Sequence, residues 1–215
     1  LHDALPIYNF PSPAYTLRLN YNGVPGLRVG ASFYYCANTA ANSDKLVEYS
    51  FRAPLRIYTV DAQYKNSVVT ARANFMWGSL TNSDRVSSVN TKLSNQSPYT
   101  RVVPVAHKAV SYGAEVGLNL AGIFRGANVP AIYPFARYDY YNPQKQCEGL
   151  YIEDHRCEVS KWTAGVNWYA LPNLVIKADY STRQIGTSKM FGKGKYNSEN
   201  EFSIGVAYVG WFTKR

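Results

Sequence analysis

Apolar and polar side chains alternate along most of the chain, and the alternation restarts after each turn. In the run 202–212, for example, Phe202, Ile204 and Val206 share one face. A period of two is typical of a β-strand with one apolar face, and a strand that crosses a membrane needs about 9–11 residues. The pattern therefore predicts a chain built from amphipathic strands.

Nine such runs can be counted, and turn-forming residues separate several of them. Asn22-Gly23-Val24-Pro25-Gly26 follows the first run, and Leu171-Pro172-Asn173 separates the seventh from the eighth. Gly, Pro and Asn at these points predict hairpins. The predicted strands are Tyr15–Asn22, Leu27–Tyr35, Tyr58–Tyr64, Val69–Trp77, Tyr112–Leu120, Ile132–Tyr141, Lys161–Trp168, Leu174–Arg183 and Phe202–Phe212.

Short and long connections alternate along the chain. Bacterial outer-membrane barrels have short periplasmic turns and long extracellular loops. We therefore expect an all-β fold, an antiparallel up-and-down transmembrane β-barrel with its long loops outside. A soluble all-β domain is the alternative, because its strands alternate too. The short connections lie near 22–26, 65–67, 121–131 and 171–173, and the long ones near 37–54, 79–104, 142–158 and 185–199.

Composition and charge fit a bacterial outer-membrane location. Aromatic residues make up 15% of the chain, 19 of them tyrosines, and the mean hydropathy is −0.29. A barrel with a wet lumen gives this average because only every second residue meets lipid. The net charge of +9 fits an anion pore or contact with outer-membrane lipid and lipopolysaccharide. No patch of basic and aromatic residues forms outside the strand pattern, so no nucleic-acid partner is predicted.

We expect the barrel to be incomplete. Residues 1–7 resemble the translation of a sequencing adapter, so we expect them to be an artefact and residues 8–215 to be the C-terminal part of an outer-membrane β-barrel. Single-chain bacterial barrels have even numbers of strands, so nine strands predict at least one more.

Four stretches resemble the C-terminal half of phosphate-selective porins O and P, in the form common among Bacteroidota. The resemblance covers roughly residues 15–215. It implies a 16-stranded, homotrimeric anion channel with a basic constriction, and phosphate as a candidate solute. The stretches are Gly23–Ser32, Asp61–Lys65, Pro134–Tyr138 and Ala170–Tyr180.

The polar positions of the strands carry more basic than acidic side chains. These positions hold seven basic residues and four acidic ones, so their net charge is +3. The acidic residues are Asp61, Glu115, Asp139 and Asp179. Arg and Lys around a narrow pore favour anions, so we expect these residues to line a pore for small anionic solutes. Alternatively, the charges pair across neighbouring strands and neutralise each other. The predicted pore-lining residues are Arg18, Arg28, Arg72, Arg137, Lys161, Lys177 and Arg183.

The predicted function is that of an outer-membrane porin for passive diffusion of small, preferentially anionic solutes. A surface-exposed structural or adhesive barrel, whose loops bind ligands without a conducting pore, is the alternative. No enzyme is predicted, since His107 and His155 have no evident nucleophile beside them. Asp154, His155 and Cys157 could contact a metal ion, but a lone cluster in a solvated loop is more often only part of the loop. No cofactor or metal site is therefore predicted.

Cys147 and Cys157 bracket nine residues of one long loop. In an oxidising periplasm a disulfide between them would stabilise the loop by about 2.5 kcal/mol, so we expect this disulfide. Two reduced thiols are the alternative. Cys36 is left without a partner in the sequence pattern.

Overall fold

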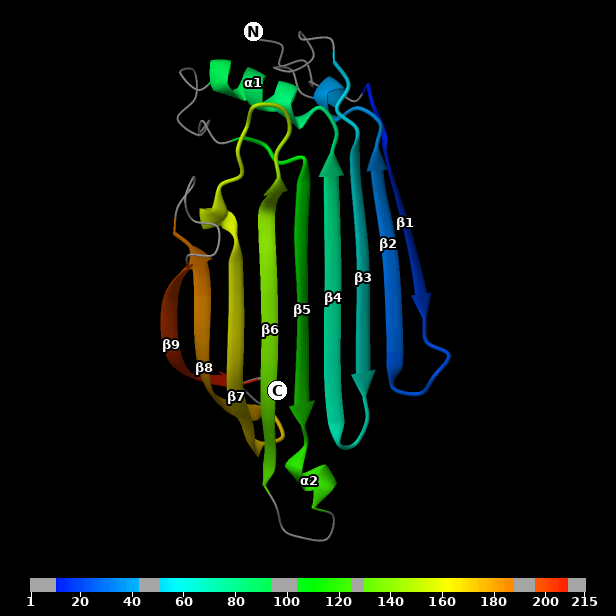
Figure 1. Cartoon of the computed structure of the whole chain (residues 1–215). Helices are drawn as coiled ribbons and strands as arrows, with labels where there is room; N and C mark the ends of the chain where they lie inside the picture. Colours follow the sequence, from blue (N-terminus) through cyan, green and yellow to red (C-terminus); the bar gives the residue numbers. More distant parts are fainter. Residues whose placement is uncertain (1–10, 43–50, 94–103, 125–129, 188–195, 209–215) are drawn as a thin grey trace, which may run out of the picture.

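The computed structural model describes residues 11–42, 51–93, 104–124, 130–187 and 196–208. They form a single antiparallel sheet of nine strands whose spatial order follows the chain (Figure 1). The predicted artefact at residues 1–7 and the strand end at Phe212 lie outside the described residues. The strands are β1 (Ala14–Tyr21), β2 (Leu27–Cys36), β3 (Leu55–Lys65), β4 (Val69–Leu80), β5 (Lys108–Leu118), β6 (Ala131–Gln146), β7 (Val159–Leu171), β8 (Leu174–Gly186) and β9 (Tyr196–Tyr208).

This topology confirms the predicted number of strands and their up-and-down order. Every strand pairs with its neighbours in the sequence, as in hairpin-built barrels. No second sheet packs on either face within the described ranges, so the two layers of a soluble β-sandwich are not found there. In the same part of the chain, no helix is both long and apolar enough to cross a membrane.

Local hydrogen bonds explain why the short turns form where the sequence predicts them. Between β3 and β4 the side-chain oxygen of Asn66 accepts hydrogen bonds from the backbone N–H groups of Val68 and Val69, at 2.8 and 2.6 Å. An Asn side chain thus replaces a backbone acceptor at the turn. After the first turn, Gly26 adopts a φ of +80°, which favours glycine. Its carbonyl accepts from Lys65 N at 2.8 Å, which ties β2 to the end of β3.

The long connections are partly structured and gather at one end of the sheet (Figure 1). They contain the helix α1 (Ser83–Leu93) and the short 3₁₀ segments η1 (Thr39–Asn42) and η4 (His155–Cys157). The single turn α2 (Leu120–Ile123) lies at the opposite end, with the short turns. We call these the long-loop end and the short-turn end.

The main buried cluster lies at the long-loop end and not on the sheet faces. Ala40, Phe51, Ala53, Val86 and Val89 form a core, against which Leu80 and Val105 pack. It joins the β2–β3 connection to the β4–β5 connection, and we call the assembly the loop cap. Sequence reasoning treated these connections as polar loops and missed it, because its apolar residues are scattered among Ser, Asn and Lys.

Candidate functional site

The two faces of the sheet differ in chemistry across its whole width. Directly opposed residues on antiparallel strands share a face, so the strand register sorts the side chains. On the apolar face, Leu19 and Ile204 are 67% and 69% exposed, since no part of the described chain covers them. A soluble protein would bury such a surface, whereas lipid covers it in a membrane. One row of the apolar face reads Leu27, Tyr64, Ala71, Val116, Ala136, Ala164, Tyr180 and Phe202.

The opposite face, the polar face, carries all seven of the basic residues predicted to line a pore. The register places Arg18 opposite Ser32, Lys177 between Asn167 and Gly205, and the others among equally polar partners. Their common face is therefore settled by backbone pairing, while a role in conduction stays a prediction. These residues are Arg18, Arg28, Arg72, Arg137, Lys161, Lys177 and Arg183.

Most charges of the polar face lie in two neighbouring rows, which we call the charged belt. The rows are two residues apart along the strands, about 7 Å. The row nearer the long-loop end contains Asp61, Asn74, Gly113, Asp139, Lys161, Arg183 and Glu199. The other row contains Arg28, Gln63, Arg72, Glu115, Arg137, Thr163, Ser181 and Glu201.

Ion pairs join most of these charges. They agree in part with the alternative in which these charges neutralise each other, since Arg72–Glu115 and Arg183–Glu199 join neighbouring strands. Each pair is partly exposed, so it orders side chains more than it stabilises the fold. The pairs are Arg18–Asp61 at 2.7 Å, Arg72–Glu115 at 2.8 Å, Arg137–Asp139 at 2.6 Å, Lys161–Glu201 at 3.6 Å and Arg183–Glu199 at 2.5 Å.

Two of the pairs reach across an intervening strand, and a small residue makes room for each. Arg18 on β1 meets Asp61 on β3 above Gly30 of β2, where an added Cβ would collide with the Arg18 guanidinium. Lys161 on β7 meets Glu201 on β9 across β8, where the buried Ser181 stands opposite Glu201. Both ion pairs therefore join strands that are not hydrogen-bonded neighbours.

The structure corrects the predicted charge of the polar face. Glu199 and Glu201 belong to it, although the sequence pattern placed residues 185–199 in a loop and began the last strand at Phe202. Strand β9 starts earlier, at Tyr196, and the all-polar run 197–201 shows no alternation that would have revealed it. With Lys65 also on this face, eight basic residues stand against six acidic ones among the strand residues with a described pairing partner, so the excess is +2 and not +3.

Three basic residues of the polar face take part in no ion pair of the described residues: Arg28, Lys65 and Lys177. Lys65 and Lys177 lie on the short-turn side of the charged belt. Lys177 lines a hollow of about 410 Å³ together with Asn167 and Asp179. Asp179 of the same face also takes part in no ion pair of the described residues, so these three cations and one carboxylate account for the excess of +2.

The long-loop end of the polar face is apolar. A hollow of about 390 Å³ is lined there by Leu55, Ile57, Met76, Leu80 and Val105. Leu80 and Val105 also touch the core of the loop cap, so the hollow lies where the cap meets the sheet. The polar face thus changes from apolar to charged along the strand direction.

The predicted cysteine pair lies in the described part of the β6–β7 connection. Cys147 is buried and Cys157 half-buried, and the structure holds both as thiols, so the disulfide stays a prediction. Burial, and then the nearby carboxylate of Asp154, raise the pKa of the Cys157 thiol. Asp154 is engaged by Arg156, whose Nη2 lies 2.6 Å from Oδ2. Among the described residues, no group of three or more His, Cys, Asp or Glu side chains could hold a metal ion.

Comparison with known families agrees with this architecture. Residues 131–209, which include β6 to β9, match the family model described as phosphate-selective porin O and P. Over these residues the match bears out the resemblance to phosphate-selective porins O and P stated from the sequence. No curated protein matches the chain.

Proposed function

We propose that this outer-membrane porin lets small solutes diffuse passively and prefers anions. The observation that carries the proposal is the two-faced sheet, with an uncovered apolar side and a polar side crossed by the charged belt. A lipid-facing wall and a hydrated, charged lumen are the two surfaces that a diffusion pore requires.

The preference for anions is attributed to Arg28, Lys65 and Lys177. A paired Arg and carboxylate present a dipole, whose field falls off faster than that of a lone charge. The three unpaired cations outnumber the one unpaired carboxylate, Asp179, and therefore dominate the potential that a passing ion meets in the lumen. Phosphate is one candidate solute, supported by the description of the matching family.

Closure of the barrel requires more strands than the nine described. Strands β1 and β9 are the two edges of the sheet and pair with no further strand in the described part of the chain. An open edge in lipid would leave backbone groups without hydrogen-bond partners. We therefore infer that the described strands are one section of a larger barrel. The homotrimer implied by the resemblance stays a prediction.

Orientation follows from the loops. The long-loop end with its loop cap faces outward and the short turns face the periplasm, as in other bacterial barrels. The loop cap would then stand at the outer mouth, in contact with lipopolysaccharide.

The test is electrical. The full-length protein is reconstituted in planar bilayers, and its conductance and reversal potential are measured in a KCl gradient. A pore with a chloride-to-potassium permeability ratio above one is expected. If well-folded protein gives no conductance, a structural or adhesive barrel is favoured instead. A chloride-to-potassium permeability ratio below one would refute the anion preference.

A further inference from the structure

The apolar face carries two charged side chains, and both belong to one row. Arg56 of β3 and Lys108 of β5 are placed there by their pairing with Ser79 of β4. Among strand residues with a described pairing partner, no other Asp, Glu, Lys or Arg lies on this face. The row reads Tyr15, Tyr35, Arg56, Ser79, Lys108 and Gln146.

The row places both cations at one level of the sheet. Their backbones are two interstrand spacings apart, about 10 Å, and the side chain between them, Ser79, is small and buried. The Arg56 guanidinium lies 5.8 Å from the centre of the Tyr35 ring, a cation–π contact on the β2 side of β3, away from Lys108. Neither cation has an ion-pair partner among the described residues.

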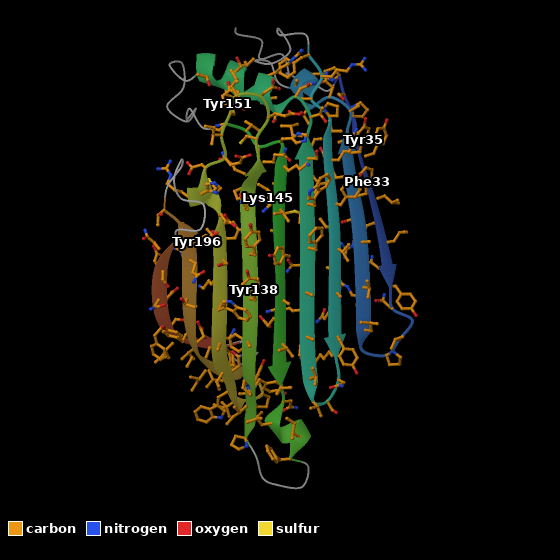
Figure 2. All side chains as sticks on the ribbon, in the orientation of Figure 1. Phe33, Tyr35, Tyr138, Lys145, Tyr151 and Tyr196 are labelled. Carbon is orange, nitrogen blue, oxygen red and sulfur yellow. The ribbon has the colours of Figure 1, made fainter. Side chains whose placement is uncertain are left out.

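The neighbouring row fixes the depth of this pair in the membrane. Phe33, Tyr58 and Trp77 pack side by side there, with ring centroids 4.8 and 5.6 Å apart. Clusters of this kind mark the boundary between hydrocarbon and headgroups. Tyr35 lies nearer than Phe33 to the α1 end of β2 (Figure 2). The basic row is thus one step beyond the aromatic boundary, at the level of lipid headgroups.

We propose that Arg56 and Lys108 bind a phosphate on the headgroup of an outer-leaflet lipid. The inference rests on the proposed function, because it requires the long-loop end to face outward. Two uncompensated cations share one row at the level of headgroup phosphates, and hydrogen bonds from a cation to phosphate are short and strong. Tyr58 and Trp77 contact the acyl chains of the same lipid.

The experiment measures lipid A bound to the detergent-purified full-length protein by native mass spectrometry. The test variant is Arg56→Gln/Lys108→Gln. Its matched control, Arg28→Gln/Lys65→Gln, removes the same charge from the polar face. Arg56→Lys/Lys108→Arg keeps the charge. From the usual attraction of two basic residues to an anionic surface, the test variant should bind lipid A about thirtyfold more weakly. The control and the charge-keeping variant should bind it within about threefold of the wild type.

Further arms identify the source of the phosphate. Dephosphorylated lipid A should bind as weakly to the wild type as lipid A binds to the test variant, and inorganic phosphate should not displace lipid A. Equal lipid A binding by the wild type and the test variant overturns the site. Full displacement by inorganic phosphate overturns the lipid as its ligand. Conductance is recorded on the same preparations. A protein that conducts but shows no lipid contact at Arg56 and Lys108 overturns the lipid site and leaves the proposed function intact.

Discussion

At the scale of single residues, pairing decides what each charge of the polar face contributes. Arg72 stands 2.8 Å from Glu115, so together they are close to neutral for an ion several ångströms away. Lys177 has no such partner within the described residues. The number of basic residues on the polar face therefore overstates the positive electrostatic potential of that face.

The first prediction separates paired from unpaired cations. Lys177→Gln should lower the chloride-to-potassium permeability ratio about threefold, because it removes an unneutralised charge from the lumen. The double variant Arg72→Gln/Glu115→Gln removes a pair and should leave the ratio unchanged. Reversal potentials in bilayers measure both. A large drop for the double variant would mean that pairing does not neutralise these charges.

The second prediction concerns the two loop cysteines. In protein isolated without reductant, Cys147 and Cys157 should resist alkylation under denaturing conditions and become reactive only after reduction, as expected for a disulfide in an oxidising compartment. In the reduced, folded protein the raised pKa of Cys157 lowers its thiolate fraction at neutral pH. Its alkylation should therefore speed up as pH rises toward that pKa. Intact mass after alkylation reads both results, and prompt labelling of unreduced, denatured protein would disprove the disulfide.

At the scale of strands, glycines decide how closely neighbouring side chains can pack. A Cβ added to Gly165 of β7 would lie 2.7 Å from the carbonyl oxygen of Ala178 and 2.6 Å from Cβ of Asp179. A Cβ added to Gly205 of β9 would meet nothing within 4 Å. Both glycines are on the polar face.

The third prediction uses this contrast. Gly165→Ala should destabilise the folded protein by about 1–3 kcal/mol, because strand backbone must move to accept the methyl group. Gly205→Ala serves as the control and should stay within about 0.5 kcal/mol of the wild type. Urea unfolding in lipid vesicles gives both values. Equal stabilities would show that the β7–β8 contact relaxes freely.

The fourth prediction concerns the joint between two long loops. Glu148 Oε2 accepts hydrogen bonds from the backbone N–H of Ser83 at 2.7 Å and from its hydroxyl at 3.2 Å, at the start of α1. Glu148→Gln weakens these two hydrogen bonds and should destabilise α1 by about 1 kcal/mol. Hydrogen exchange across 83–93 should quicken several-fold. Glu199→Gln, far away on β9, is the control and should leave exchange in α1 unchanged.

At the scale of the whole molecule, the two faces meet different solvents. The fifth prediction compares neighbours on β9 that point to opposite faces, Ile204 and Ser203. Ile204→Arg places a charge in lipid and should cost about 2–4 kcal/mol near the midplane. Ser203→Arg points into the lumen and should cost less than about 1 kcal/mol. Unfolding in vesicles measures the difference, and a reversed order would put lipid on the polar face.

The sequence by itself determined the strands, their order and their two faces. A period of two sorts side chains locally, and a one-residue slip would turn a whole strand inside out. The positions of Arg137 and Val206 on opposite faces therefore followed from counting along the chain. Connection lengths likewise predicted which strand ends lie together.

The tertiary structure alone decided which charges meet. Asp61 reaches Arg18 over Gly30, and Lys161 reaches Glu201 over Ser181, although the partners are 43 and 40 residues apart in the sequence. Local alternation carries no information about such contacts, nor about the core of the loop cap, whose members come from separate loops. For the same reason the row shared by Arg56 and Lys108 emerged only from the strand register, because register depends on hydrogen bonds between strands and not on the pattern within one.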